Sequence, residues 1–172
     1  MKLRAGTSGY SYTDWKGSFY PADVKAGGML EAYARRLPAV EINSSFYRMP
    51  RRRTLESWAG QVPEAFRFAI KASRRITHFK RLRDAGDELA YLLDVVGALE
   101  RRLGALLFQL HPHASADLPL LASFLRDLPD GVRAAFEFRH RSWHVPEVHE
   151  LLAAHDCALV ASDAPGAPGG DE

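Results

Sequence analysis

Polar side chains lie near the carboxyl ends of five short apolar runs in this sequence of 172 residues. Glutamate and aspartate at such places can act as general acids or bases when neighbouring groups set their pKa values apart. Amides orient a bound molecule through hydrogen bonds, and lysine and arginine bind negative charge. The residues concerned are Glu41, Asn43, Lys71, Gln109, Glu137, Arg139 and Asp163.

The elements that would position these residues are short strands alternating with helices. Apolar runs bounded by polar or turn-forming residues predict strands over 3–9, 39–43, 66–72, 103–110, 133–139 and 157–163. Helical patterns occupy 27–37, 54–62, 88–103, 117–128 and 145–155, with Thr54 and Asp117 as expected N-caps and Pro146 in a first turn. This alternation predicts an α/β fold with parallel strands and right-handed crossovers.

The alternation of side chains along each strand predicts which way the polar residues point. In 39–43, Glu41 and Asn43 share one face, and Val40 and Ile42 take the other. The other four runs have the same design, with bulky apolar residues on one face and a polar residue near the end of the other. We expect the bulky face to pack against helices and the polar residues to converge where parallel α/β folds bind ligands. The alternatives are charged ends that merely reach water, or an ion network around Arg139.

Two further chemistries, metal binding and anion binding, have candidate residues in the sequence. Metal binding could draw on Glu41, His78, Glu137, His140 and Asp163, but they form no recognised ligand signature, so no metal ligand is assigned and cofactors stay unknown. Anion binding could use Lys71 with the cations after it, together with backbone N–H groups in a tight turn at Gly6–Gly9. Nucleophilic catalysis has little support, because Cys157 is expected to open its strand, opposite the proposed site, as a buried small residue.

Composition indicates one globular domain without a membrane span. Hydrophobic residues make up 47% of the chain and charged residues 26%, and no run of 18 apolar residues occurs. One cysteine, and no apolar stretch typical of a signal peptide, favour a cytoplasmic location. The net charge is +2, yet residues 48–83 carry +9, which suggests either a solvated basic surface or a site for nucleic acid or phosphate.

Five segments resemble a known family. GTSGYSYTDWKGSFYP, VEINSSFYRMP, FRFAIKASRRITHFKRL, LLFQLHP and AFEFRHRSW, in this order, are similar to signature segments of the domain-of-unknown-function 72 (DUF72, YecE-like) family. The resemblance implies a TIM-barrel-like fold related to the sugar-isomerase and endonuclease IV group, without an established activity. It implies a pocket formed by Glu41, Asn43, Tyr47, Lys71, His78, Gln109, Glu137, Arg139, His140 and Asp163.

Two departures from the family pattern set expectations of their own. His111-Pro112 stands where the family usually has two prolines, and the chain stops before two further strands of the family. We therefore expect a single, incomplete TIM-barrel-like domain with about six of the eight strands. Whether it is a natural truncation, a fragment or a barrel closed by another chain stays open, as does the oligomeric state.

Three functional hypotheses follow. The first is a hydrolase or isomerase acting on a sugar-like or phosphate-bearing molecule, with Glu137, Asp163 and Glu41 as catalytic candidates. Its substrate-binding candidates are Asn43, Tyr47, Lys71, His78, Gln109, Arg139 and His140. The second is a non-enzymatic binder of nucleic acid or phosphate that uses the basic 48–83 region. The third is an inactive truncated barrel.

Overall fold

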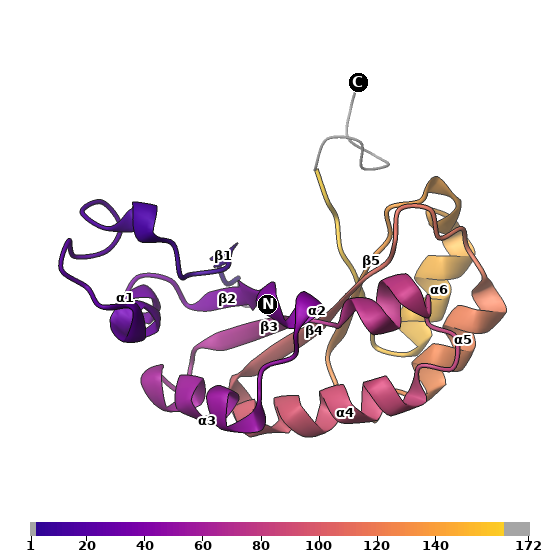
Figure 1. The fold of residues 1–172 in the computed structure, drawn as a ribbon. Helices are drawn as coiled ribbons and strands as arrows, with labels where there is room; N and C mark the ends of the chain where they lie inside the picture. Colours follow the sequence, from indigo (N-terminus) through magenta and orange to yellow (C-terminus); the bar gives the residue numbers. More distant parts are fainter. Residues whose placement is uncertain (1–2, 164–172) are drawn as a thin grey trace. The chain divides into compact units, whose positions relative to one another are not determined.

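A computed structural model describes residues 3–163 (Figure 1). The strands are β1 (Gly6–Ser8), β2 (Ala39–Ile42), β3 (Arg67–Lys71), β4 (Leu103–Gln109), β5 (Ala134–Glu137) and β6 (Ala158–Leu159). The α-helices are α1 (Met29–Ala34), α2 (Ser44–Tyr47), α3 (Arg52–Gln61), α4 (Gly86–Val96), α5 (Leu118–Arg126) and α6 (Pro146–Ala154). Short 3-10 segments are η1 (Thr13–Trp15), η2 (Ala26–Gly28), η4 (Gly97–Arg102) and η5 (Arg141–Trp143), and η3 (Arg75–Phe79) is a π-helix.

The described chain forms two compact units, which are treated separately below. Unit 1 comprises the residues up to 70 together with 93–104, and unit 2 comprises 71–92 and the residues from 105 onward. In unit 1, β2 pairs with β1 and with β3, and both pairs are parallel. In unit 2, β5 pairs in parallel with β4 and with β6. The predicted α/β class with parallel strands is confirmed.

The core of unit 1 follows the predicted alternation of side chains. Val40 and Ile42 of β2 are buried, while Glu41 between them is half-buried. Phe68 and Ile70 of β3 are fully buried. Apolar side chains on one face of a strand lose water contact together when a helix covers that face, and this burial is the main stabilising term of the layer.

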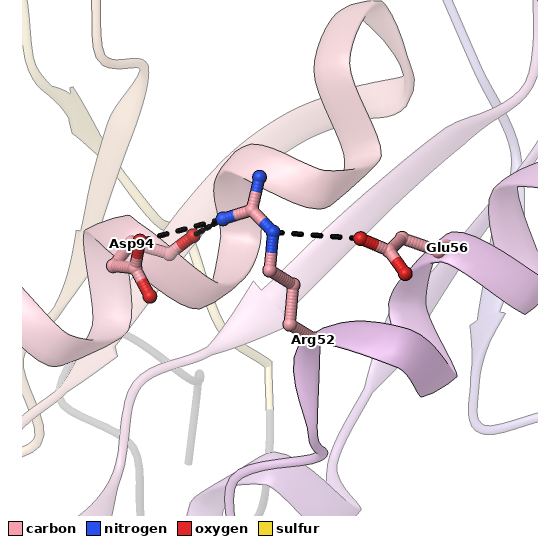
Figure 2. A network of polar contacts seen from close by, with 3 residues as sticks. All are labelled: Arg52, Glu56 and Asp94. Atoms are coloured by element: carbon pink, nitrogen blue, oxygen red, sulfur yellow. Dashed lines mark hydrogen bonds and ion pairs between the residues drawn. The ribbon is translucent and has the colours of Figure 1, made fainter.

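An arginine of α3 forms a hydrogen bond and an ion pair with Asp94 near the end of α4 (Figure 2). Arg52 Nη1 donates to the backbone oxygen of Asp94 at 2.7 Å and lies 3.3 Å from its carboxylate, while Arg52 Nε lies 3.4 Å from Glu56. All three side chains are more than half exposed. Because water screens such pairs, they contribute little to stability.

The core of unit 2 is built from stacked aromatic side chains. Phe108 of β4 lies nearly parallel to Phe136 of β5, with ring centroids 5.1 Å apart, and Phe124 of α5 meets Phe108 edge-on. Phe138 continues the row and stacks on Trp143 at 4.5 Å. In β4 the opposite face is buried too, since Leu107 and Gln109 are each 7% exposed. Gln109 therefore needs a polar partner inside the fold.

The helix and strand ends correct some expectations. Asp117 is the N-cap of α5 and accepts from Leu120 N at 3.0 Å, and Pro146 stands in the first turn of α6, as predicted. The prediction that Thr54 is an N-cap was wrong, because α3 begins at Arg52 and the residue before it, Arg51, is extended. Strand β6 is shorter than predicted, and half-buried Cys157 precedes it. Within residues 3–163, no helix combines the length and apolar character needed to span a bilayer.

Candidate functional site

The polar candidates of unit 2 gather at the carboxyl ends of β4 and β5. Gln109 and Glu137 are the last residues of these strands and lie opposite each other in the parallel register. Ala72, which follows β3, donates its backbone N–H to Leu107 O at 2.8 Å, so the end of β3 with Lys71 lies beside β4. Polar side chains thus lie where β3, β4 and β5 end. In parallel α/β folds, binding sites lie at these carboxyl ends of the strands.

Glu137 is a buried carboxylate with two fixed donors. It is 7% exposed. Gln109 Nε2 donates to its Oε2 at 2.8 Å, and Arg139 Nε donates to its Oε1 at 3.1 Å. The Arg139 side chain is 41% exposed. A buried carboxylate is costly to desolvate unless such donors compensate it, and these two donors supply that compensation.

His78 lies in the same unit, on the π-helix η3. The pKa of His78 is lowered to about 4. Burial is the largest cause, and repulsion from His111, Lys71 and Arg139 adds to it. Its ring meets the His111 ring at 5.2 Å, and its Nδ1 lies 2.9 Å from Thr77 Oγ1. His78 is therefore neutral at pH 7, with a ring able to donate or accept a proton. A π-helix of this kind is often found at functional sites.

His140 is held in the loop after β5. Its Nδ1 lies 2.8 Å from Ser142 Oγ, and it also accepts from Ser142 N at 3.3 Å. Ser142 Oγ accepts from Ala116 N at 2.7 Å, which ties this loop to the segment before α5. The ring of His140 is thus oriented through its Nδ1 nitrogen.

In unit 1, Glu41 and Asn43 share a third residue that sequence reasoning missed. Ser8 Oγ donates to Glu41 Oε1 at 3.1 Å, and Asn43 Nδ2 donates to the same Ser8 Oγ. Tyr12 OH donates to the backbone oxygen of Ser8 at 2.6 Å. A small cavity of about 230 Å³ is lined by Asn43 together with aromatic side chains that include Tyr12. The position of Ser8 at the end of a predicted strand was the available signal.

The backbone at Gly6–Gly9 is not the anion-binding turn predicted from the sequence. Gly6–Ser8 are strand β1 itself. Thr7 N–H donates to Tyr33 OH and Gly9 N–H donates to Glu41 O, both at 2.8 Å. Gly9 has φ +82°, and a Cβ there would lie 2.5 Å from Tyr12 OH, so glycine is required. The N–H groups of Thr7 and Gly9 are therefore already used within the fold.

Two predicted residues are exposed to solvent. Asp163 is exposed and lies beyond β6. Tyr47 is 68% exposed at the end of the short helix α2 and contacts Phe46 edge-on. Among residues 3–163, no three His, Cys, Asp or Glu side chains lie together as possible metal ligands. Of the predicted residues, unit 2 contains Lys71, His78, Gln109, Glu137, Arg139, His140 and Asp163, and unit 1 contains Glu41, Asn43 and Tyr47.

Comparison with protein families finds one match along nearly the whole chain. The model described as "Protein of unknown function DUF72" matches residues 4–171. UPF0759 protein YunF of Bacillus subtilis is 32% identical over 146 residues, which is 77% of this chain and 50% of YunF. UPF0759 protein YecE of Escherichia coli K12 is 33% identical over 123 residues, or 70% of this chain and 45% of YecE.

Solved structures of DUF72 family proteins have a similar fold. A DUF72 family protein from Thermotoga maritima has 29% identity and a TM-score of 0.75 over 91% of this chain and 63% of its own. One from Enterococcus faecalis, at 22% identity, also has a TM-score of 0.75, over 91% of this chain and 59% of its own. The fold is accordingly TIM-barrel-like, and the chain spans about half the length of the curated relatives it matches.

Proposed function

Because this chain belongs to the DUF72 family, whose function is unknown, its chemistry has to be argued from its own side chains. We propose that it is a hydrolase or isomerase that acts on a sugar-like or phosphate-bearing molecule at the polar strand ends of unit 2. The observation that carries this proposal is Glu137, a buried carboxylate held by Gln109 and Arg139. We further propose that the protein acts in the cytoplasm.

The roles follow from the electrostatics of the group. Glu137 is the acid–base residue, since its oxygens are oriented and largely shielded from water. Neutral His78 is a second proton carrier, held in its unprotonated form by burial and by the neighbouring cations. Lys71 and Arg139, which both disfavour the protonation of His78, supply the positive field for a negatively charged substrate group.

The remaining candidates keep supporting roles in this proposal. In unit 2, Asp163 is a second, solvent-exposed carboxylate, and His140 binds substrate. Unit 1 is considered by itself, and there Glu41 and Asn43 orient polar groups through the network around Ser8. Hydroxyl-rich substrates suit such sites, because carboxylates and amides together accept and donate hydrogen bonds.

The test compares wild type with Glu137→Gln on two substrate panels, nitrophenyl glycosides for hydrolysis and aldose phosphates for isomerisation. Glutamine keeps the shape of the side chain but cannot exchange the proton, so we expect a loss of turnover of about 10²–10⁴-fold in a protein that still unfolds in one cooperative transition. Glu150→Gln, an exposed glutamate of α6, is the matched control and should keep full turnover. Equal rates for Glu137→Gln and wild type would contradict the proposal.

The basic 48–83 region supports a nucleic-acid function less well. Three of its cations have acidic partners within the fold: Arg52 with Glu56 and Asp94, Lys80 with Glu88, and Arg83 with Asp117. Arg74, just before η3, and Arg75, its first residue, are both exposed. A nucleic-acid binder would lose affinity for a single-stranded oligonucleotide on Arg74→Ala/Arg75→Ala, with a steep salt dependence, and would ignore Glu137→Gln.

A further inference from the structure

Unit 2 contains a cavity that none of the proposed site residues line. Its volume is about 610 Å³, within the usual range for small-molecule sites. Leu110, Leu118 and Trp143 form part of its apolar wall. Trp143 is rigidly held, because it stacks on Phe138 and its Nε1 donates to Ala114 O at 2.7 Å. An apolar body of a ligand would therefore meet a preformed surface.

The cavity is lined by more cations than anions. Its charged residues are Arg81, Arg83 and Asp117. Arg83 Nη2 donates to Asp117 Oδ2 at 2.8 Å, and the other oxygen of Asp117 caps α5. Within residues 3–163, the guanidinium of Arg81 has no hydrogen bond or ion pair, although its charge reaches His111 and helps to lower the pKa of that ring, after burial. In the described part of the chain, exposed Arg81 is therefore a cation without an acidic partner at this cavity.

The backbone that carries Arg81 is strained. Arg81, Leu82 and Asp84 all have left-handed φ angles, of 48°, 71° and 45°. Side chains other than glycine, asparagine and aspartate rarely adopt this conformation. The segment is held in place by bonds from Leu82 N to Ile76 O at 2.9 Å and from Lys80 Nζ to Asp84 O at 2.6 Å. Strain that the surroundings enforce is found preferentially at ligand sites.

We propose that this cavity binds an organic anion, an apolar body that carries a phosphate or a carboxylate, with the anionic group on Arg81 and the body against Leu110, Leu118 and Trp143. A cation alone would bind any small anion, and an apolar wall alone would bind any neutral ring. The combination selects molecules that carry both parts. The inference goes beyond the proposed function, because it concerns a separate cavity that none of the proposed site residues line.

The test is a calorimetric titration of the full chain with four probes. Phenyl phosphate and benzoate carry both parts, inorganic phosphate carries only the charge, and benzyl alcohol carries only the ring. We expect the better of the first two to bind at least about tenfold more tightly than either of the last two, as one charge-assisted contact allows. The ratio between phenyl phosphate and benzoate then identifies the anionic group.

Two variants separate binding from folding. Arg81→Asn removes the cation and places a residue that tolerates the left-handed backbone, so the melt should hold or rise while affinity falls about tenfold or more. Asp84→Asn changes a second left-handed position of the same segment without removing a cation, and it should keep the affinity. Ala116→Leu narrows the cavity without touching Arg81, and it should weaken the organic anions but not inorganic phosphate.

Three results would overturn the proposal. They are no heat with either organic anion at millimolar concentration, benzyl alcohol binding as tightly as the better of the two organic anions, or unchanged affinity in Arg81→Asn. The proposal can fail while Glu137→Gln still abolishes turnover, and it can hold while Glu137 proves dispensable. The two sites are therefore tested independently.

Discussion

Gln109 and Glu137 should behave as one unit in stability measurements. Both are 7% exposed, and they face each other across β4 and β5 with the Gln109 Nε2–Glu137 Oε2 bond at 2.8 Å. Gln109→Leu leaves a buried carboxylate oxygen without its donor, and Glu137→Leu leaves a buried amide without its acceptor. Each single change should cost about 1–3 kcal/mol of unfolding free energy, because an unsatisfied buried polar group loses its hydration without replacement.

The double variant Gln109→Leu/Glu137→Leu should be far more stable than the sum of the single changes predicts. It replaces both partners with apolar side chains of similar size, which is often neutral in a buried position. We expect it within about 1 kcal/mol of wild type, and hence a coupling energy of at least about 1 kcal/mol between the two residues. Arg139, which would lose Glu137, is 41% exposed and can turn to water.

Urea unfolding at pH 7 measures these differences from the transition midpoints, provided that the m-value stays constant. Arg139→Gln is the control, and it should cost less than about 1 kcal/mol because the side chain is largely solvated. Additive costs, with a coupling below about 0.5 kcal/mol, would refute the reasoning. In that case water, rather than the cross-strand hydrogen bond, would be compensating the buried groups.

Three further predictions concern packing, capping and pH. Phe136→Ala should lower the unfolding free energy by about 3–5 kcal/mol in urea, since the ring is fully buried against Phe108. Asp117→Ala should cost about 1–2 kcal/mol through the lost N-cap of α5, whereas Asp117→Asn should retain most of that cap in the same thermal melt. The pKa of His78 is about 4 in the fold and 6.5 when unperturbed, so the unfolded chain binds more protons between these values. Stability from this group is therefore complete above pH 6.5 and declines as pH falls towards 4, and His78→Asn should flatten that part of a stability–pH profile. An NMR titration that shows His78 protonated at pH 6 would contradict this account.

The positions of most strands, and the polar residues at their ends, could be predicted from the sequence because both depend on local patterns. Alternation places Val40 and Ile42 on one face and Glu41 on the other, whatever the rest of the chain does. The runs at 39–43, 66–72 and 103–110 therefore appear as strands within a residue or two of their predicted bounds. His78 and His140 follow the strands, so alternation along a strand does not indicate them, and the family resemblance placed them in the pocket.

The extent of β6 was not predictable in the same way. Its run of apolar residues suggested a strand over 157–163, but a strand extends only as far as a neighbour supplies hydrogen bonds. β5 pairs with it at Ala158 and Leu159 alone. Likewise, the N-terminus of α3 depends on where the extended chain at Arg51 turns into the helix, and Thr54 gave a misleading signal.

The sequence by itself determined the α/β class, the parallel strands and the residue types at the strand ends, because periodicity and side-chain chemistry are local properties. Tertiary structure decided how those residues are used. Burial and neighbouring cations make His78 a neutral ring, a cross-strand bond to Gln109 compensates Glu137, and the left-handed segment at Arg81 and Leu82 lines a cavity. The pKa of His78, the hydrogen bonding of Glu137 and the cavity beside Arg81 arise from contacts between residues far apart in the chain, which no local pattern contains.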